Sequence, residues 1–207
     1  MLVFSEYQTD TIDLALDFYG YEDCPKNYEF GPSVRDNFVL HFITKGKGVF
    51  HINKKEIHLE AGDLFLLPKN KVTYYQADAE DPWSYYWIGI SGTKVSDFMR
   101  FSTLHEKGFL KKTEVDTDRI GQFMEQLVHK AEASKMTSHY QLHLLSQIYE
   151  LLFLISEVAP DIHRSHPSPT YQLYLTCKHV IETHYNKDHL SIQEIADDSH
   201  PVCNPKN

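Results

Sequence analysis

Apolar residues in the first part of the chain form short runs separated by glycine, proline and charged residues, with no helical period between them. The pattern predicts strands at residues 37–44, 49–52, 56–59, 64–67, 72–77 and 83–88. Closely spaced short strands are typical of an antiparallel sandwich or small barrel, and not of a sheet built from βαβ units. The glycine turn at Lys45–Gly48 predicts that residues 37–44 and 49–52 pair as a hairpin.

The stretch from Gly62 to Gly92 holds three of these strands in succession. Residues 64–67 form an apolar run closed by a proline, a pattern that indicates a strand buried on both faces. In the last strand, alternation places Tyr85 and Trp87 on one face and their neighbours on the other. Aromatic rings on one face can line a pocket or belong to ordinary barrel core, and the pattern fits both.

Beyond residue 92 the apolar positions recur at helical spacing. Helices are predicted at residues 93–101, after residue 116 and at 140–158. The last of them has more apolar surface than one contact with the barrel would cover. We expect either a homodimer interface or packing between the barrel and the neighbouring helix. The stripe that would form the interface is Leu144, Leu145, Ile148, Leu151, Leu152 and Ile155.

Residues 159–170 contain prolines and serines without periodicity, which predicts a linker. A helical pattern resumes at residues 171–185, and Ser191 and Glu194 then have the spacing of a capping box that opens another helix. Pro201 and Pro205 oppose its continuation.

The chain carries 20 Lys and Arg against 29 Asp and Glu, a net charge of −9. This balance argues against a surface that coats nucleic acid or an anionic membrane. The three cysteines, Cys24, Cys177 and Cys203, are scattered, as expected for free thiols in a reducing compartment. No secretory signal or membrane span is predicted, so we expect a cytoplasmic protein with no membrane partner.

The 13 histidines show no metal-binding spacing, and the patterns of nucleophile elbows, phosphate loops and dinucleotide sites are absent. The sequence therefore predicts no metal, no cofactor and no catalytic residues. Arg35 offers planar donors suited to a hydroxylated or carboxylated ligand. The alternative is an ion pair at the barrel rim with Asp36 or Glu22.

Several stretches together resemble one known family. They are GYEDC at residues 20–24, FGPSVRD at 30–36, GKG at 46–48 and ADAEDPWSYYWI at 77–88. These motifs resemble the effector-binding domain of the AraC/XylS family of bacterial transcription regulators, particularly its sugar-utilisation members, and the similarity extends over about residues 4–185. The resemblance implies a mixed β and α fold: a cupin-like double-stranded β-helix, or jelly-roll barrel, followed by an antiparallel pair of helices that dimerises in many members.

The resemblance also implies the site and the function. In sugar-binding members a tryptophan, tyrosines and an arginine near the barrel mouth hold the sugar, and the matching positions here are Trp87, Tyr85, Tyr75 and Arg35, with His41 as a further candidate. We expect a regulator of carbohydrate utilisation, favouring an activator, with a small sugar effector. A cupin-type sugar-modifying enzyme and a dimerisation-only module remain alternatives.

We divide the chain into a barrel at residues 1–92, a dimerisation region at 93–158, a linker at 159–170 and an incomplete DNA-binding start at 171–207. In the last part Ser191, Glu194 and Ala196 resemble the first helix of a helix-turn-helix motif, whose recognition helix is missing. Base readout requires that recognition helix. We therefore expect operator DNA as a partner only of a full-length form.

Overall fold

The computed structural model describes residues 13–133, 138–162, 169–185 and 191–199. The chain divides into two compact units, Met1–Ile162 and His163–Asn207. We describe each unit by itself.

The first unit contains two antiparallel sheets. The five-stranded sheet has the order β1-β8-β3-β6-β9, and the four-stranded sheet has the order β2-β7-β4-β5. The strands of the first sheet, in that order, are Ala15–Asp23, Ser84–Ser91, Phe38–Lys45, Leu64–Leu67 and Phe109–Leu110. Those of the second are Glu29–Val34, Val72–Ala77, Lys47–Ile52 and Lys55–Glu60.

The predicted hairpin between residues 37–44 and 49–52 is wrong, although both strands exist. β3 pairs with β6 and β8, whereas β4 pairs with β5 and β7 in the other sheet. Gly46, with a φ of 70°, turns the chain across the corner between the sheets. A glycine there predicts a turn, but the strand that pairs with each arm is set by contacts far apart in sequence.

Two apolar cores share the five-stranded sheet. Its inner face and the four-stranded sheet enclose one cluster, which includes Phe50, Phe65 and Trp83. Its outer face packs with the helices in a second cluster, which includes Leu64 and Leu66. The strand at residues 64–67 is therefore buried on both faces, as predicted.

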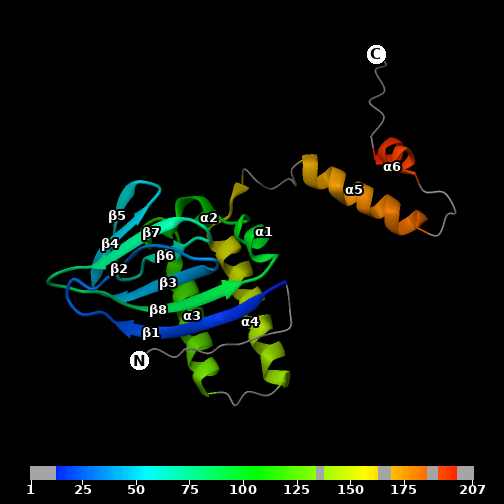
Figure 1. Ribbon diagram of the computed structural model, residues 1–207. Coiled ribbons are helices and arrows are strands. Elements are labelled where there is room, and N and C mark those ends of the chain that lie inside the picture. Colours follow the sequence, from blue (N-terminus) through cyan, green and yellow to red (C-terminus); the bar gives the residue numbers. More distant parts are fainter. Residues whose placement is uncertain (1–12, 134–137, 163–168, 186–190, 200–207) are drawn as a thin grey trace. The chain divides into compact units, whose positions relative to one another are not determined.

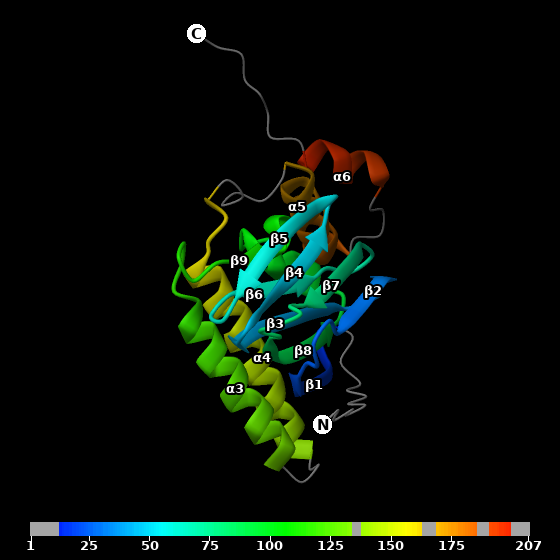
Figure 2. The same ribbon diagram turned by 90° about the vertical axis from the view of Figure 1, so that its left-hand side faces the viewer.

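The described residues of the first unit also form the helices α1 (Val95–Met99), α2 (Leu104–Lys107), α3 (Thr117–Ala133) and α4 (Ser138–Val158). Figures 1 and 2 show α3 and α4 side by side along the five-stranded sheet. They are antiparallel, because Arg119 near the start of α3 pairs with Glu157 near the end of α4. The predicted fold class, a cupin-like double-sheet barrel followed by an antiparallel helical pair, is confirmed.

The first unit unites the predicted barrel and the predicted helical region. Strand β9 comes from beyond residue 92 and completes the sheet. A 2.8 Å hydrogen bond from Ser102 Oγ to the carbonyl of Ala159 ties the start of the predicted linker to the same unit. Residues 163–168 of the predicted linker lie outside the described residues. The predicted limits of the four parts stay predictions.

The second unit contains α5 (Pro169–His184) and α6 (Ile192–Ser199). The capping box predicted before α6 is confirmed. The backbone N–H of Ser191 donates to Glu194 Oε2 at 2.9 Å, and the N–H of Glu194 donates to Ser191 Oγ at 3.1 Å. These two residues thus satisfy free donors at the start of the helix. Pro201, Cys203 and Pro205 lie outside the described residues.

Candidate functional site

Strand β8 carries side chains to both cores in strict alternation. Tyr85 and Trp87 join the cluster between the sheets, whereas Tyr86 and Ile88 join the cluster beneath the helices. The predicted division of the strand into two faces is therefore confirmed. Of the two inward rings, Tyr85 is 2% exposed and Trp87 is 8% exposed, so Trp87 lies closer to solvent.

The centre of the barrel is built from tyrosines of both sheets. The hydroxyls of Tyr75 on β7 and Tyr85 on β8 lie 3.2 Å apart, within hydrogen-bonding distance. Burial is the main cause that raises the pKa of both phenols above the ordinary value. Both groups are therefore neutral at physiological pH and can donate or accept a hydrogen bond.

His41 on β3 lies beside this pair. Its ring stacks on Phe65 at 4.4 Å between centroids and meets Tyr85 edge-on at 4.9 Å. Burial, helped by the charge of Arg35, lowers the pKa of His41 to about 3. The imidazole is therefore neutral, and its buried Nδ1 meets no hydrogen-bond partner within the residues that the structure describes.

Arg35 lies among aromatic rings nearer the solvent. Its guanidinium carbon is 4.7 Å from the centroid of Phe30 and 5.7 Å from that of Phe18, both within cation–π range. Phe18 in turn contacts Trp87 at 5.4 Å. We call Phe18, Phe30, Arg35 and Trp87 the arginine cluster.

The ion-pair alternative for Arg35 is not observed. Among the described residues, no salt bridge joins Arg35 to Asp36 or Glu22. Its Nε is buried, and no residue in the described part of the chain gives it a hydrogen-bond partner. The guanidinium is thus held in place by rings and keeps hydrogen-bonding capacity for another group.

The structure brings together all five residues predicted for the site. Phe30 stacks on Tyr75 at 5.5 Å, so the arginine cluster continues into the tyrosine pair and His41. Sequence reasoning missed Phe18 and Phe30, because it assigned no strand before residue 37. The strand Glu29–Val34 contains Gly31 and Pro32, which interrupt the residue pattern typical of a strand. The apolar residues near Phe18, in contrast, could have indicated the strand that contains it.

Trp83 belongs to the same cluster between the sheets. It is fully buried and stacks on Phe65 at 5.5 Å. Cys24 lies in the same cluster, and burial raises the pKa of its thiol to about 11. Both residues therefore belong to the packed core, and the thiol is unreactive at physiological pH.

The stripe predicted for dimerisation faces the protein's own core. Five of its residues are buried in the cluster between α4, α3 and the sheet, and Leu145 packs against that cluster. The buried five are Leu144, Ile148, Leu151, Leu152 and Ile155. The stripe thus follows the alternative drawn from the sequence, packing within one chain, and its side chains are already covered.

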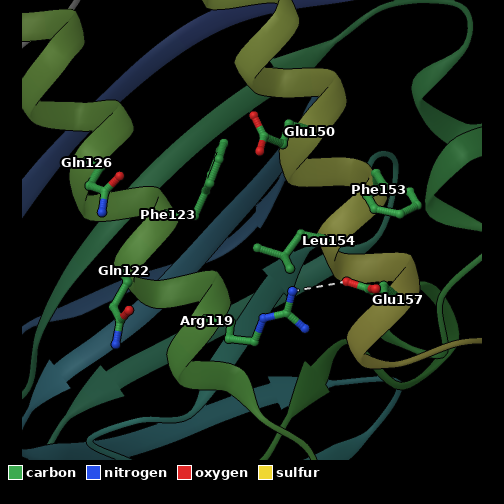
Figure 3. Close-up of a pocket in the computed structure, with 8 residues that line it drawn as sticks. All are labelled: Arg119, Gln122, Phe123, Gln126, Glu150, Phe153, Leu154 and Glu157. Carbon is green, nitrogen blue, oxygen red and sulfur yellow. Dashed lines mark hydrogen bonds and ion pairs between the residues drawn. The ribbon is translucent and has the colours of Figure 1, made fainter.

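Other apolar residues of α4 remain exposed. Leu142, Tyr149 and Phe153 are 70%, 45% and 65% exposed. Their spacing of seven and four residues places them on one face of the helix. Beside Phe153 lies a groove of about 300 Å³ between α3 and α4, in which Figure 3 shows Phe123 and Leu154 between the two helices.

A polar ion pair crosses this groove. Arg119 Nη2 lies 3.1 Å from Glu157 Oε2, with both side chains about half exposed. The remaining wall is polar and is formed by Gln122, Gln126 and Glu150. Pairs this exposed contribute little stability, so the groove is not closed by strong internal contacts.

Metal ligation has no support in the part of the chain that the structure describes. No group of three His, Cys, Asp or Glu side chains there could hold an ion. In the same part, no helix is long and apolar enough to cross a membrane. Ser191, Glu194 and Ala196 lie at the start of α6, and their predicted role in DNA binding stays a prediction.

Several characterised proteins are similar to this chain. The Msm operon regulatory protein of Streptococcus mutans is 35% identical over 94% of the chain and 69% of its own length. The raffinose operon transcriptional regulatory protein RafR of Pediococcus pentosaceus is 42% identical over 47% of the chain and 36% of its own length. The lactose operon transcription activator of Staphylococcus xylosus is 26% identical over 94% of the chain and 69% of its own length.

Solved structures add a weaker likeness. The Schizosaccharomyces pombe Cnp3 cupin domain matches 48% of the chain and 68% of its own length at 16% identity, and its TM-score of 0.36 is too low to carry an argument.

The model of the AraC-like ligand binding domain matches residues 15–152, which include both sheets and most of the helical pair. The chain therefore belongs to the AraC family and carries its AraC-like ligand-binding domain.

Proposed function

We propose that this chain is the effector-sensing part of a transcription regulator of carbohydrate utilisation, and that a sugar binds between its sheets at the arginine cluster. The regulator acts on operator DNA in the cytoplasm as a full-length form. Three similar proteins are named as regulators of operons, two of them for raffinose and lactose. Those two names support a galactose-containing saccharide as the effector and, through the lactose operon activator, an activating role.

The observation that carries the proposal is the state of Arg35. A guanidinium held by Phe18 and Phe30, whose buried Nε finds no hydrogen-bond partner among the described residues, is costly unless a ligand supplies an oxygen. Saccharide hydroxyls supply such oxygens. The ring of Trp87 suits the apolar C–H face of a pyranose, and the phenols of Tyr75 and Tyr85 suit its hydroxyls.

Isothermal titration with raffinose, lactose, glucosides and pentoses tests the proposal. We expect one saccharide to bind more tightly than about 1 mM, and Trp87→Ala to abolish that binding. Phe101→Ala, which truncates an exposed ring outside both the proposed sugar site and the proposed dimer face, is the control and should bind as the unmodified chain does. Failure of every saccharide to bind more tightly than about 1 mM would contradict the sugar assignment.

The proposal describes a binding barrel and not an enzyme. The alternative, a cupin-type sugar-modifying enzyme, requires a metal ion or other catalytic group in the barrel. Metal analysis of the purified protein separates the two. A stoichiometric ion that is lost in His41→Phe would overturn the assignment as a binding barrel.

We also propose that the chain forms a homodimer. The support is the exposed apolar face of α4, made by Leu142, Tyr149 and Phe153, of which Phe153 borders the groove between α3 and α4. An exposed apolar face with a polar rim is typical of a protein interface. Sedimentation at several concentrations tests this, and a strict monomer would contradict both the dimer and a dimerisation-only module.

A further inference from the structure

Two glycines and two aromatic residues alternate across the pairing of β1 with β8. Gly20 lies opposite Trp87, and Phe18 lies opposite Gly89. Each glycine therefore faces a ring carried by the neighbouring strand. The two rings also contact each other, with centroids 5.4 Å apart and planes tilted by 58°.

The ring of Trp87 occupies the space that a side chain at Gly20 would need. A Cβ added at Gly20 would lie 2.7 Å from Cζ2 and 2.9 Å from Cε2 of Trp87. Carbon atoms in contact normally keep about 3.5–4.0 Å. A Cβ added at Gly89 would likewise overlap the ring of Phe18.

The backbone does not explain these glycines. Neither Gly20 nor Gly89 is among the glycines with a positive φ, so other residues could adopt their conformation. Glycine in a strand weakens it, since it has no side chain to pack and loses more entropy on folding. The missing side chain is therefore what the position requires: it lets the aromatic ring lie directly against the neighbouring strand.

We propose that Gly20 is a positioning residue of the sugar site, a proposal that rests on the proposed function. Gly20 does not contact the sugar. It sets the plane of Trp87 and, through the contact of Trp87 with Phe18, the ring beneath Arg35. The sugar ring packs on a wall formed by Trp87 and Phe18, which makes Phe18 a further contact residue for the same apolar face of the ligand.

The test measures ring position and affinity separately in Gly20→Ala. The protein is labelled with fluorotryptophan, and its two tryptophan signals are assigned with Trp87→Phe. We expect the fluorine signal of Trp87 to shift while that of Trp83 stays in place. We also expect the dissociation constant for raffinose or lactose, whichever binds the unmodified chain, to rise by about tenfold or more.

Gly121→Ala is the matched control. A Cβ at Gly121 would also overlap an aromatic ring, that of Phe42, but in the core beneath the helices. It should leave the signal of Trp87 and the affinity unchanged. If Gly20→Ala fails to fold, the double variant Gly20→Ala with Trp87→Phe should restore folding, because the smaller ring removes the overlap.

The outcomes separate the two proposals. If no saccharide binds the unmodified chain, the proposed function fails, while a shifted Trp87 signal in Gly20→Ala still supports the positioning role. An unshifted signal with unchanged affinity overturns the positioning role and leaves the sugar site standing. A Gly20→Ala variant that stays unfolded even with Trp87→Phe also overturns it, because relief of the overlap would then have no effect.

Discussion

The hydroxyls of Tyr75 and Tyr85 join the two sheets of the barrel across a distance of 3.2 Å. Tyr75 belongs to the four-stranded sheet and Tyr85 to the five-stranded sheet. Both side chains are at most 4% exposed, so the bond lies away from bulk solvent. The same two phenols are proposed to meet the sugar, which must therefore exchange this bond for bonds of its own.

We expect Tyr75→Phe to reduce the free energy of unfolding by about 1 kcal/mol, because it removes the bond and leaves the Tyr85 hydroxyl buried without that partner. Urea unfolding measures the change. Tyr74→Phe is the control, since the Tyr74 hydroxyl donates to Glu29 at an exposed site. In a double-mutant cycle, Tyr75→Phe and Tyr85→Phe should be less costly together than their sum, and additive costs would show that the pair is not coupled.

The contribution of Arg35 can be divided between charge and shape. Arg35→Lys keeps the charge but loses the planar group that lies over Phe30 and Phe18. We expect both Arg35→Lys and Arg35→Ala to weaken sugar binding by about tenfold or more, measured by titration calorimetry. Arg100→Lys, on the surface beside Asp97, is the control. Full affinity in Arg35→Lys would mean that only the charge matters.

Much of the barrel could be predicted because its strands are local patterns. Alternation placed Tyr85 and Trp87 inside, and the apolar run at residues 64–67 indicated burial on both faces. Strand pairing could not be predicted in the same way. β3 and β4 follow each other through a glycine turn yet lie in different sheets, since pairing depends on contacts between distant segments.

The site could be predicted only in part, because a local motif identifies its own residues but not those that distant segments bring beside them. The motifs that resemble the family contain Arg35, Tyr85 and Trp87, and the structure brings these residues together with Tyr75 and His41. Phe18 lies outside those motifs. The apolar stripe on α4 shows a different limit of the sequence. Its spacing predicted a buried face, but only the structure shows that the sheet and α3 cover that face.

Two residues of α4 separate core packing from association. Leu151 is 1% exposed within the core, whereas Phe153 is 65% exposed beside the groove. We expect Leu151→Ala to reduce the free energy of unfolding by about 2–5 kcal/mol through the cavity it leaves. Phe153→Ala should change it by less than about 0.5 kcal/mol in the monomer but weaken the proposed dimer.

Chemical unfolding at low concentration and sedimentation at rising concentration measure these two effects separately. Ser156→Ala, on the same helix, is the control for Phe153→Ala. A dimer that survives Phe153→Ala unchanged would place the interface elsewhere. If Leu151→Ala abolished the dimer without lowering the free energy of unfolding, the interface would have to include the predicted stripe.

The buried imidazole of His41 should make the protein less stable in mild acid. Its pKa is lowered from 6.5 to about 3 in the folded chain, so between these values the unfolded chain binds a proton that the folded chain does not. The free energy of unfolding therefore falls as the pH decreases through this range, by at most about 1.4 kcal/mol per pH unit. His105, whose pKa burial also lowers, acts in the same direction.

His41→Phe removes the titrating group and keeps a ring that can stack on Phe65. We expect its free energy of unfolding, measured by urea titration at several pH values above about 4, to depend less on pH than that of the unmodified chain. The variant His105→Gln measures how much of the pH dependence comes from His105. The carboxylates of Asp23 and Asp78, whose pKa values are lowered from 3.8, lose their contribution only at still lower pH. If His41→Phe kept the full pH dependence, the imidazole would have to be protonated or hydrated in the folded barrel, and the unpartnered Nδ1 would not face a dry interior.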